Sequence, residues 1–127
     1  MLRRLRAFTL IELLVVMAII ATLLTVAVPR YLQSVDRARD AALRQTLAAA
    51  RDAIDKYYGD TGRYPDTLQQ LVDKRYLRRT PYDPVTQSDM TWVVVPSDTE
   101  RGGQGGVYDV HSGAPGNGHD GTAYADW

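Results

Sequence analysis

Cysteine is absent from this 127-residue chain, and histidine occurs only twice. Without cysteine no disulfide can hold the loops together, so they must be stabilised in another way. Basic and acidic residues balance at 15 each, which gives no support for nucleic-acid binding, since that favours a basic face. Two histidines and scattered carboxylates supply no recognisable set of nucleophile, base and orienting group. We therefore expect neither an enzyme nor a nucleic-acid-binding protein.

The charge is unevenly distributed. Three arginines lie among the first seven residues, which leaves 12 basic against 15 acidic residues from Phe8 onward. The run from Phe8 to Pro29 follows directly, and Glu12 is its only ionisable side chain. About 20 apolar residues cross the core of a bilayer, and the positive-inside bias holds the arginine side in the cytoplasm. We expect one membrane-spanning helix, with the amino terminus inside and the rest of the chain outside.

Glu12 needs an explanation, because an ionisable group inside a membrane is costly and usually marks function or a partner. In one interpretation it lies near the cytoplasmic interface, where water reaches it. In the other, a cation meets it within the membrane. The span contains no lysine or arginine, so this cation would come from elsewhere. A free amino group, created by cleavage just before Phe8, would serve.

The segment from Ala7 to Glu12 reads Ala-Phe-Thr-Leu-Ile-Glu after a short arginine-bearing leader. It resembles the type III signal of type IV pilins and type II secretion pseudopilins. The resemblance implies that a prepilin peptidase cuts between Ala7 and Phe8 and methylates the new amino terminus. It also implies that Glu12 pairs with the amino terminus of a neighbouring subunit, and that Pro29 is the family's helix-kinking proline. One departure is Ala7, where the family usually has glycine.

An ordinary secretory signal is the alternative interpretation of this run. It would use Leu10 to Val28 as its apolar core and be cut near residues 25–27. The run exceeds the 7–15 residues of such a core, and Glu12 would interrupt it. We favour pilin-type processing, with residues 1–7 as a cleaved leader and residues 8–29 as the transmembrane and polymerisation helix.

Residues 30–58 have an amphipathic pattern. Apolar or small side chains recur there at close to a 3.6-residue period. They are Leu32, Val35, Ala42, Leu43, Thr46, Ala50, Ala53, Ile54 and Tyr57. Two acid-before-base pairs at i,i+4, Asp40–Arg44 and Asp52–Lys56, are expected to stabilise the helix by a few tenths of a kcal/mol each.

One helix is therefore predicted over residues 8–58, bent at Pro29, which has no backbone N–H to donate. Gly59 is the expected carboxy-terminal cap. The apolar first half would contact lipid or other subunits. The amphipathic second half needs a covering domain, which residues 59–127 must supply.

The covering domain contains several short signals. Residues 64–72 predict a second helix with Pro65 in its first turn, and the Tyr-Pro pair is similar to the pseudopilin pattern. Four basic residues follow, either a solvated face or a docking surface for an acidic neighbour. They are Lys74, Arg75, Arg78 and Arg79. Residues 80–84, with two prolines, predict a rigid turn.

Two strands are predicted at residues 91–95, ended by Pro96, and at residues 107–111. Residues 97–106 connect them as a polar, glycine-rich loop, and a third short strand is expected near residues 122–127. The expected fold is α+β and pilin-like, with a long amino-terminal helix packed on a small antiparallel sheet beside a short second helix.

Eight of the ten glycines lie between Gly102 and Gly121. Residues 113–122 contain almost nothing to bury, so either they are mobile or polar contacts hold them. The major pseudopilins resemble this chain here too, which implies a calcium ion in the loop. Calcium takes six to eight oxygens.

The implied calcium ligands match only in part. Asp120 aligns with one family ligand and Thr122 offers a further oxygen, whereas Pro115 stands where the family has an acidic ligand. Candidates to replace that ligand are Asp109, Asn117 and Asp126. The spacing is not that of an EF-hand loop. We interpret His111 and His119 as lone loop histidines rather than zinc ligands.

The residues and the resemblance together predict a structural subunit of a pilus-like filament. The most similar class is the major (G-type) pseudopilin of type II secretion systems, which drive protein export across the outer membrane. The implied partners are other copies of itself, the prepilin peptidase, the membrane, the inner-membrane assembly platform and minor pseudopilins. The globular part would be periplasmic and the span would lie in the inner membrane.

Two alternatives stay open. One is a major or minor type IV pilin that serves adhesion or motility. The other is an uncleaved, monomeric membrane-anchored binding module whose carboxy-terminal loop recognises a ligand. A Glu12→Ala change should abolish assembly of a filament subunit and leave such a module largely intact.

Overall fold

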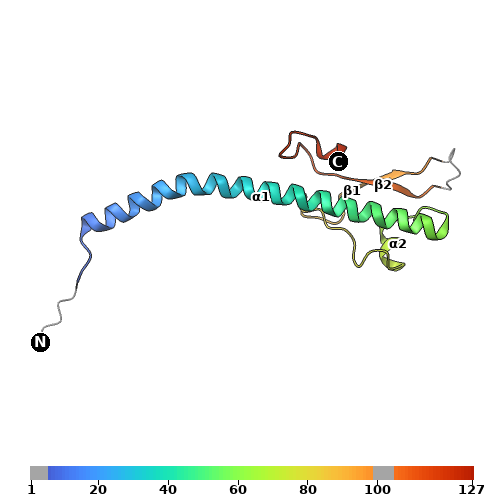
Figure 1. Cartoon of the computed structure of the whole chain (residues 1–127), viewed down its shortest axis with the longest axis horizontal. Coiled ribbons are helices and arrows are strands. Elements are labelled where there is room, and N and C mark those ends of the chain that lie inside the picture. Colours follow the sequence, from blue (N-terminus) through green and yellow to red (C-terminus); the bar gives the residue numbers. More distant parts are fainter. Residues whose placement is uncertain (1–5, 99–104) are drawn as a thin grey trace, which may run out of the picture. The chain divides into compact units, whose positions relative to one another are not determined.

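The computed structural model describes residues 6–98 and 105–127. Most of the predicted leader and much of the predicted 97–106 loop therefore lie outside the described residues. The elements in chain order are α1 (Leu10–Thr61), α2 (Leu68–Asp73), β1 (Trp92–Pro96), β2 (Val107–Ser112) and the 3-10 helix η2 (Tyr124–Asp126) (Figure 1). A long helix, a short second helix and a two-stranded antiparallel sheet confirm the predicted α+β, pilin-like fold.

The chain divides into two compact units, residues 1–35 and residues 36–127, and α1 runs through both. In the first unit every described residue up to Ser34 is exposed. Pro29 lies inside α1; the kink expected there stays a prediction. One helix of the described chain is long and apolar enough to cross a membrane, and that helix is α1.

Both ends of α1 depend on local hydrogen bonds. At its start, the Glu12 N–H donates to Thr9 Oγ1 at 3.1 Å, so the Thr9 side chain caps a free backbone donor. At the other end, the helix continues through Gly59 to Thr61. Gly62 follows with a φ of 72° and its N–H donates to the Tyr58 carbonyl at 2.8 Å. The predicted cap at Gly59 is therefore wrong, because Gly62 adopts the left-handed conformation that ends helices.

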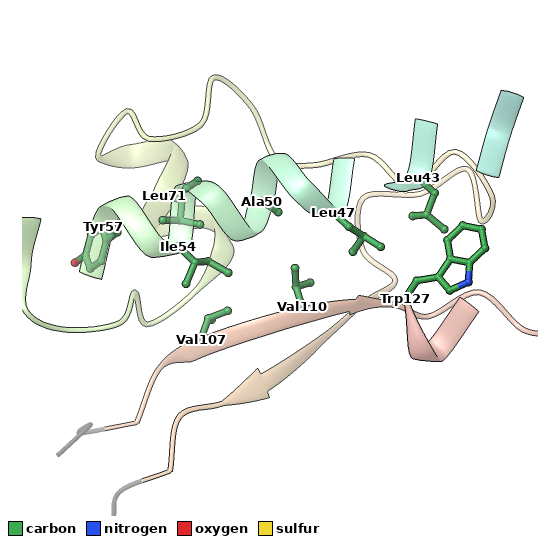
Figure 2. Close-up of a cluster of buried hydrophobic side chains, with 10 residues drawn as sticks. Leu43, Leu47, Ala50, Ile54, Tyr57, Leu71, Val107, Val110 and Trp127 are labelled. Carbon is green, nitrogen blue, oxygen red and sulfur yellow. The ribbon is translucent and has the colours of Figure 1, made fainter. Parts of the chain in front are cut away.

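The core of the second unit forms where the amphipathic face of α1 meets β2. Figure 2 shows apolar side chains of α1 pointing toward Val107 and Val110 of β2 and toward Trp127. The buried hydrophobic cluster comprises Leu43, Leu47, Ala50, Ala53, Ile54, Tyr57, Leu71, Val107, Val110 and Trp127. Five of these ten residues belong to the predicted stripe. Leu47 is a sixth core residue of α1 that the prediction missed, and Leu32, which it included, is exposed.

The second helix is shorter than predicted. Thr67 caps it, since its side-chain oxygen accepts from the Gln70 N–H at 3.2 Å. Pro65 lies before the helix rather than in its first turn, and its carbonyl accepts from the Val107 N–H at 2.7 Å. That bond ties the segment before α2 to the start of β2, which explains why Pro65 is excluded from the helix.

The two predicted strands pair antiparallel, with Trp92 opposite Ser112 and Val94 opposite Val110. The register shifts at Pro96, the last residue of β1, as expected for a residue without a backbone donor. The predicted turn ahead of the sheet is held by Asp83, which is fully buried. Its carboxylate accepts from the Val85 N–H at 2.8 Å and from the Ser112 hydroxyl.

The third strand predicted near residues 122–127 is wrong. Residues 124–126 form η2, and Asn117 pairs with Ala123 only as an isolated bridge. The chain reverses at Gly121, whose φ is 84°, and the Gly118 N–H donates to the Thr122 carbonyl at 2.8 Å. Backbone bonds within the segment thus replace those that a sheet edge would have supplied.

Candidate functional site

The first candidate site is the start of the apolar span. Ala7 and Phe8 are exposed and precede α1 without regular structure, with Phe8 84% exposed. Glu12 lies in the first turn of α1, where a carboxylate is stabilised by the helix macrodipole. The site is thus an exposed peptide without regular structure, followed directly by a helix with an acidic first turn.

Glu12 has no ion-pair partner among residues 6–98 and 105–127. The backbone around it is satisfied by Thr9, and the next polar side chains in the span also bond locally. Thr22 and Thr25 donate to the Ala18 and Ala21 carbonyls, each at 2.8 Å. The span therefore satisfies its hydroxyls internally, while the Glu12 carboxylate is available to a partner from outside the chain.

The second candidate site is the glycine-rich loop of residues 113–127, against which α1 presents polar side chains. Asp40 is a buried carboxylate, 8% exposed. It accepts from the His119 N–H at 2.6 Å and from the Tyr124 hydroxyl at 2.7 Å. The Asp40 carboxylate thus binds the loop both before and after the point near Gly121 where the chain reverses.

Arg44, one turn later on α1, binds the same loop. Its guanidinium donates to Asp120 Oδ2 at 2.7 Å and lies 3.8 Å from the centroid of the Trp127 ring. Trp127 is buried beside Leu43 and Leu47. The arginine therefore makes a charged and a cation–π contact at once.

Arg51 extends this contact to the sheet. Its guanidinium donates to Asp109 at 2.8 Å, to the Val110 carbonyl at 3.0 Å and to the Trp127 main-chain oxygen at 2.6 Å. His111 Nδ1 also lies 2.7 Å from that oxygen. The end of the loop is thereby joined both to α1 and to β2.

Asp40, Arg44 and Arg51 form what we call the polar clasp. The sequence pattern missed it, because Asp40–Arg44 was interpreted as a pair within the helix. In the part of the chain that the structure describes, Arg44 pairs instead with Asp120. The other expected pair, Asp52–Lys56, is confirmed at 2.9 Å. The only signal in the sequence was that Asp40 and Arg51 fall close to the apolar stripe.

The expected calcium ligands are only partly brought together. Thr122 donates to Asp120 Oδ1 through its hydroxyl at 2.5 Å and its N–H at 3.0 Å. Asp109 binds Arg51, Asn117 is exposed beside the loop's backbone bridge, and Asp126 is exposed on η2. Within the described ranges no three histidine, cysteine, aspartate or glutamate residues group as a metal site would need. Calcium binding stays a prediction.

Two loop groups have shifted pKa values. Hydrogen bonds from the Thr122 hydroxyl and N–H, together with the charge of Arg44, lower the pKa of Asp120. Burial, followed by the hydrogen bond to Asp40, raises the pKa of Tyr124 to about 12. Both shifts favour the protonation states that the contacts with α1 require.

Comparison with known proteins identifies a family motif and several relatives. Residues 2–28 match the prokaryotic N-terminal methylation motif. The type II secretion system core protein G of Klebsiella michiganensis is 34% identical over 95 residues, or 62% of this chain and 67% of that protein. The protein of the same name from Escherichia coli K12 is 30% identical over 126 residues, or 87% of this chain and 81% of that protein.

A type IV major pilin protein, PilA of Myxococcus xanthus, is also similar. It is 32% identical over 66 residues, which cover 52% of this chain and 30% of that protein. No solved structure matches this chain.

Proposed function

This chain belongs to the type II secretion system core protein G family, and on that premise we propose that it is the repeating subunit of the pseudopilus filament. The observation that carries the proposal is the span of residues 8–28. It is continuous, apolar and wholly exposed, and an apolar surface of this size needs burial in lipid or against other copies. The subunit would first rest in the membrane and then polymerise through this helix.

Processing would take place at the peptide before α1. We propose that the prepilin peptidase cuts between Ala7 and Phe8, where the chain is exposed and has no regular structure. Alanine is nearly as small as the family's usual glycine, so we expect the peptidase to accept it. The product begins at Phe8 with an amine that keeps its positive charge after methylation.

Glu12 would then find its partner in a neighbouring subunit. A carboxylate left unpaired in the bilayer costs about 2.5–3.5 kcal/mol on insertion scales. Neither the span nor any described residue supplies it with a cation. The Phe8 amine of the next copy is the complementary charge, and pairing would fix the axial register of one subunit against the next.

The exported part would be a structural domain without catalytic activity. We propose that the arginine-bearing leader stays cytoplasmic and that residues 59–127 lie in the periplasm, attached to the assembly platform and minor pseudopilins through the filament. The compact hairpin and loop on α1 support this role, since they cover the amphipathic half of the helix and leave the apolar half for assembly.

The intact mass and amino-terminal sequence of the protein, purified from its native membrane, test the processing step. The expected chain begins at N-methylated Phe8. A chain that retains Met1 would indicate an anchored monomer, and a chain beginning near Val28 would indicate a secreted domain. Either would contradict the subunit proposal.

Substitution of Glu12 tests assembly separately. Glu12→Gln keeps the shape but removes the charge, so we expect cross-linked multimers and secretion to fall at least about tenfold, equivalent to roughly 1.4 kcal/mol per contact. Glu12→Asp keeps the charge and should retain partial assembly. Asp55→Asn, which removes an exposed carboxylate from the same helix outside the span, is the control. Normal assembly of Glu12→Gln would refute the pairing.

A type IV pilin is the second candidate, favoured by the match to the Myxococcus xanthus pilin. That match covers 30% of the pilin. The match to the Escherichia coli core protein G covers 81% of the Escherichia coli protein. Deletion of the gene distinguishes the two functions. A pseudopilus subunit should be required for secretion of exoproteins, and a pilin for surface pili and motility.

A further inference from the structure

The loop of residues 113–127 must be held by something other than apolar packing. Apart from Trp127, Ala114 is its only buried hydrophobic residue, and the described chain has no cysteine to cross-link it. A bound calcium ion is what the family resemblance would supply. Such an ion could bind only if enough oxygen atoms of the loop were free of other partners.

The polar clasp already joins several parts of the loop to α1, which is the structural role that a bound ion would have. Asp40, Arg44 and Arg51 lie on one face of α1, spaced four and seven residues apart, so successive turns of the helix reach successive parts of the loop. Together they bind the loop's amide, hydroxyl, carboxylate, aromatic and main-chain oxygen groups. Every buried side-chain polar atom of the described residues has a hydrogen-bond partner.

Close packing of the loop on α1 supports the same conclusion. A Cβ added to Gly118 would lie 2.2 Å from Trp127 Cζ2 and 3.3 Å from Asp40 Oδ2. The loop backbone thus sits directly against the indole ring and the clasp carboxylate. The indole N–H donates to Thr122 Oγ1 at 2.6 Å, which occupies an oxygen that was expected to serve the ion.

The donor set does not fit calcium. Both oxygens of Asp120 are engaged, one by Arg44 and one by Thr122. An ion at this carboxylate would lie beside a guanidinium, and repulsion between the two cations would oppose its binding. Calcium needs six to eight oxygens, yet Asp109 is held by Arg51, and no three acidic or histidine side chains of the described chain group as a metal site would need.

We infer that the polar clasp replaces calcium in this chain, with the Arg44 guanidinium as the built-in cation that orders the loop. The loop of this subunit should therefore keep its structure without metal. This inference concerns the folding of residues 36–127 and does not depend on the filament function proposed above.

The test is thermal unfolding of the full-length protein in detergent, followed by tryptophan fluorescence. One sample contains EGTA, a second contains CaCl2, and a third contains KCl at the same ionic strength as the second. We expect the three melting temperatures to agree within about 1 °C. A filled site at 100 times its Kd would raise the melting temperature by about 10 °C or more, and an increase of several degrees that EGTA reverses would overturn the inference.

Removal of the built-in cation completes the test. Arg44→Gln should lower the melting temperature by about 4–8 °C in EGTA, as expected for the loss of an ion pair and a cation–π contact in a domain of this size. Arg39→Gln is the matched control, since Arg39 is exposed on the same helix with no described partner. Equal melting of the two variants would overturn the inference. If Arg44→Gln does not fold, the calcium comparison on the unmodified protein still decides.

Discussion

Residues 10–34 and residues 36–61 belong to the same α-helix but have opposite surroundings. In the first stretch every residue is exposed although most are apolar. In the second, one face of apolar residues is buried in the core formed with β2 and α2, and charged residues share the helix with them. The difference follows from pattern: a continuous apolar surface needs lipid or other subunits, whereas a stripe with a 3.6-residue period can be covered by the same chain.

The comparison also separates two uses of charge. Glu12 is the only ionisable side chain between Phe8 and Pro29, and it has no ion-pair partner among the described residues. The charges of the second stretch include several that face the chain's own loop, as Arg44 does toward Asp120. Under the proposed function, assembly and folding would depend on different residues of one helix, and we expect that each can be disrupted without the other.

The largest effect should come from truncating one leucine in each stretch. Leu47 is 1% exposed and Leu23 is 63% exposed. Leu47→Ala should reduce the free energy of unfolding of the globular part by about 2–5 kcal/mol, because it leaves a cavity in the core. Leu23→Ala should change it by less than about 0.5 kcal/mol. Urea denaturation of the full chain in detergent measures both, and equal losses would contradict the division of the helix.

A smaller effect is expected from the buried carboxylate of the clasp. Asp40→Ala leaves the Tyr124 hydroxyl and the His119 N–H without their acceptor, and should cost about 1.5–3 kcal/mol of unfolding free energy. Asp36→Ala is the control, since Asp36 is exposed on the same helix and gains equally in helix propensity. Denaturation midpoints that do not differ between the variants would rule out a stabilising role for Asp40.

A substitution at Gly118 should reduce the free energy of unfolding by as much as Asp40→Ala does, or by less. Gly118→Ala places a methyl group on the Trp127 ring and should destabilise by about 1–3 kcal/mol through overpacking. Gly59→Ala should have the opposite sign, stabilising by about 0.5–1 kcal/mol, because Gly59 lies in α1 with open space around it. Thermal unfolding distinguishes the two, and stabilisation by both would disprove close packing at the loop.

The smallest expected effect is the pH dependence of the loop. The pKa of Asp120 is lowered on folding from 3.8, so its stabilising contribution is present above that value and is lost as the pH falls below it. The pKa of Tyr124 is raised from 10.0 to about 12, so its contribution is present below pH 10.0 and is lost as the pH rises toward 12. The melting temperature should fall at both extremes, and Asp120→Asn should flatten the acidic side only.

Much of this architecture could be predicted from local patterns. Hydrophobic continuity identified the span around Glu12, the 3.6-residue period identified the buried face that includes Leu43 and Ile54, and β-branched runs identified both strands. Each of these signals depends on neighbours within a few turns or residues, so the chain itself carries the information. The amino-acid sequence alone therefore determined the long helix, its apolar span and the hairpin.

The contacts of the loop were decided by tertiary structure alone. Arg44 had an equally good partner four residues away in Asp40, yet it binds Asp120, 76 residues away. Residues 122–127 looked like a strand, yet the reversal at Gly121 and the burial of Trp127 turned them into η2. Local spacing cannot rank such alternatives, because the deciding term is the desolvation and pairing of groups that meet only when the loop folds onto the helix.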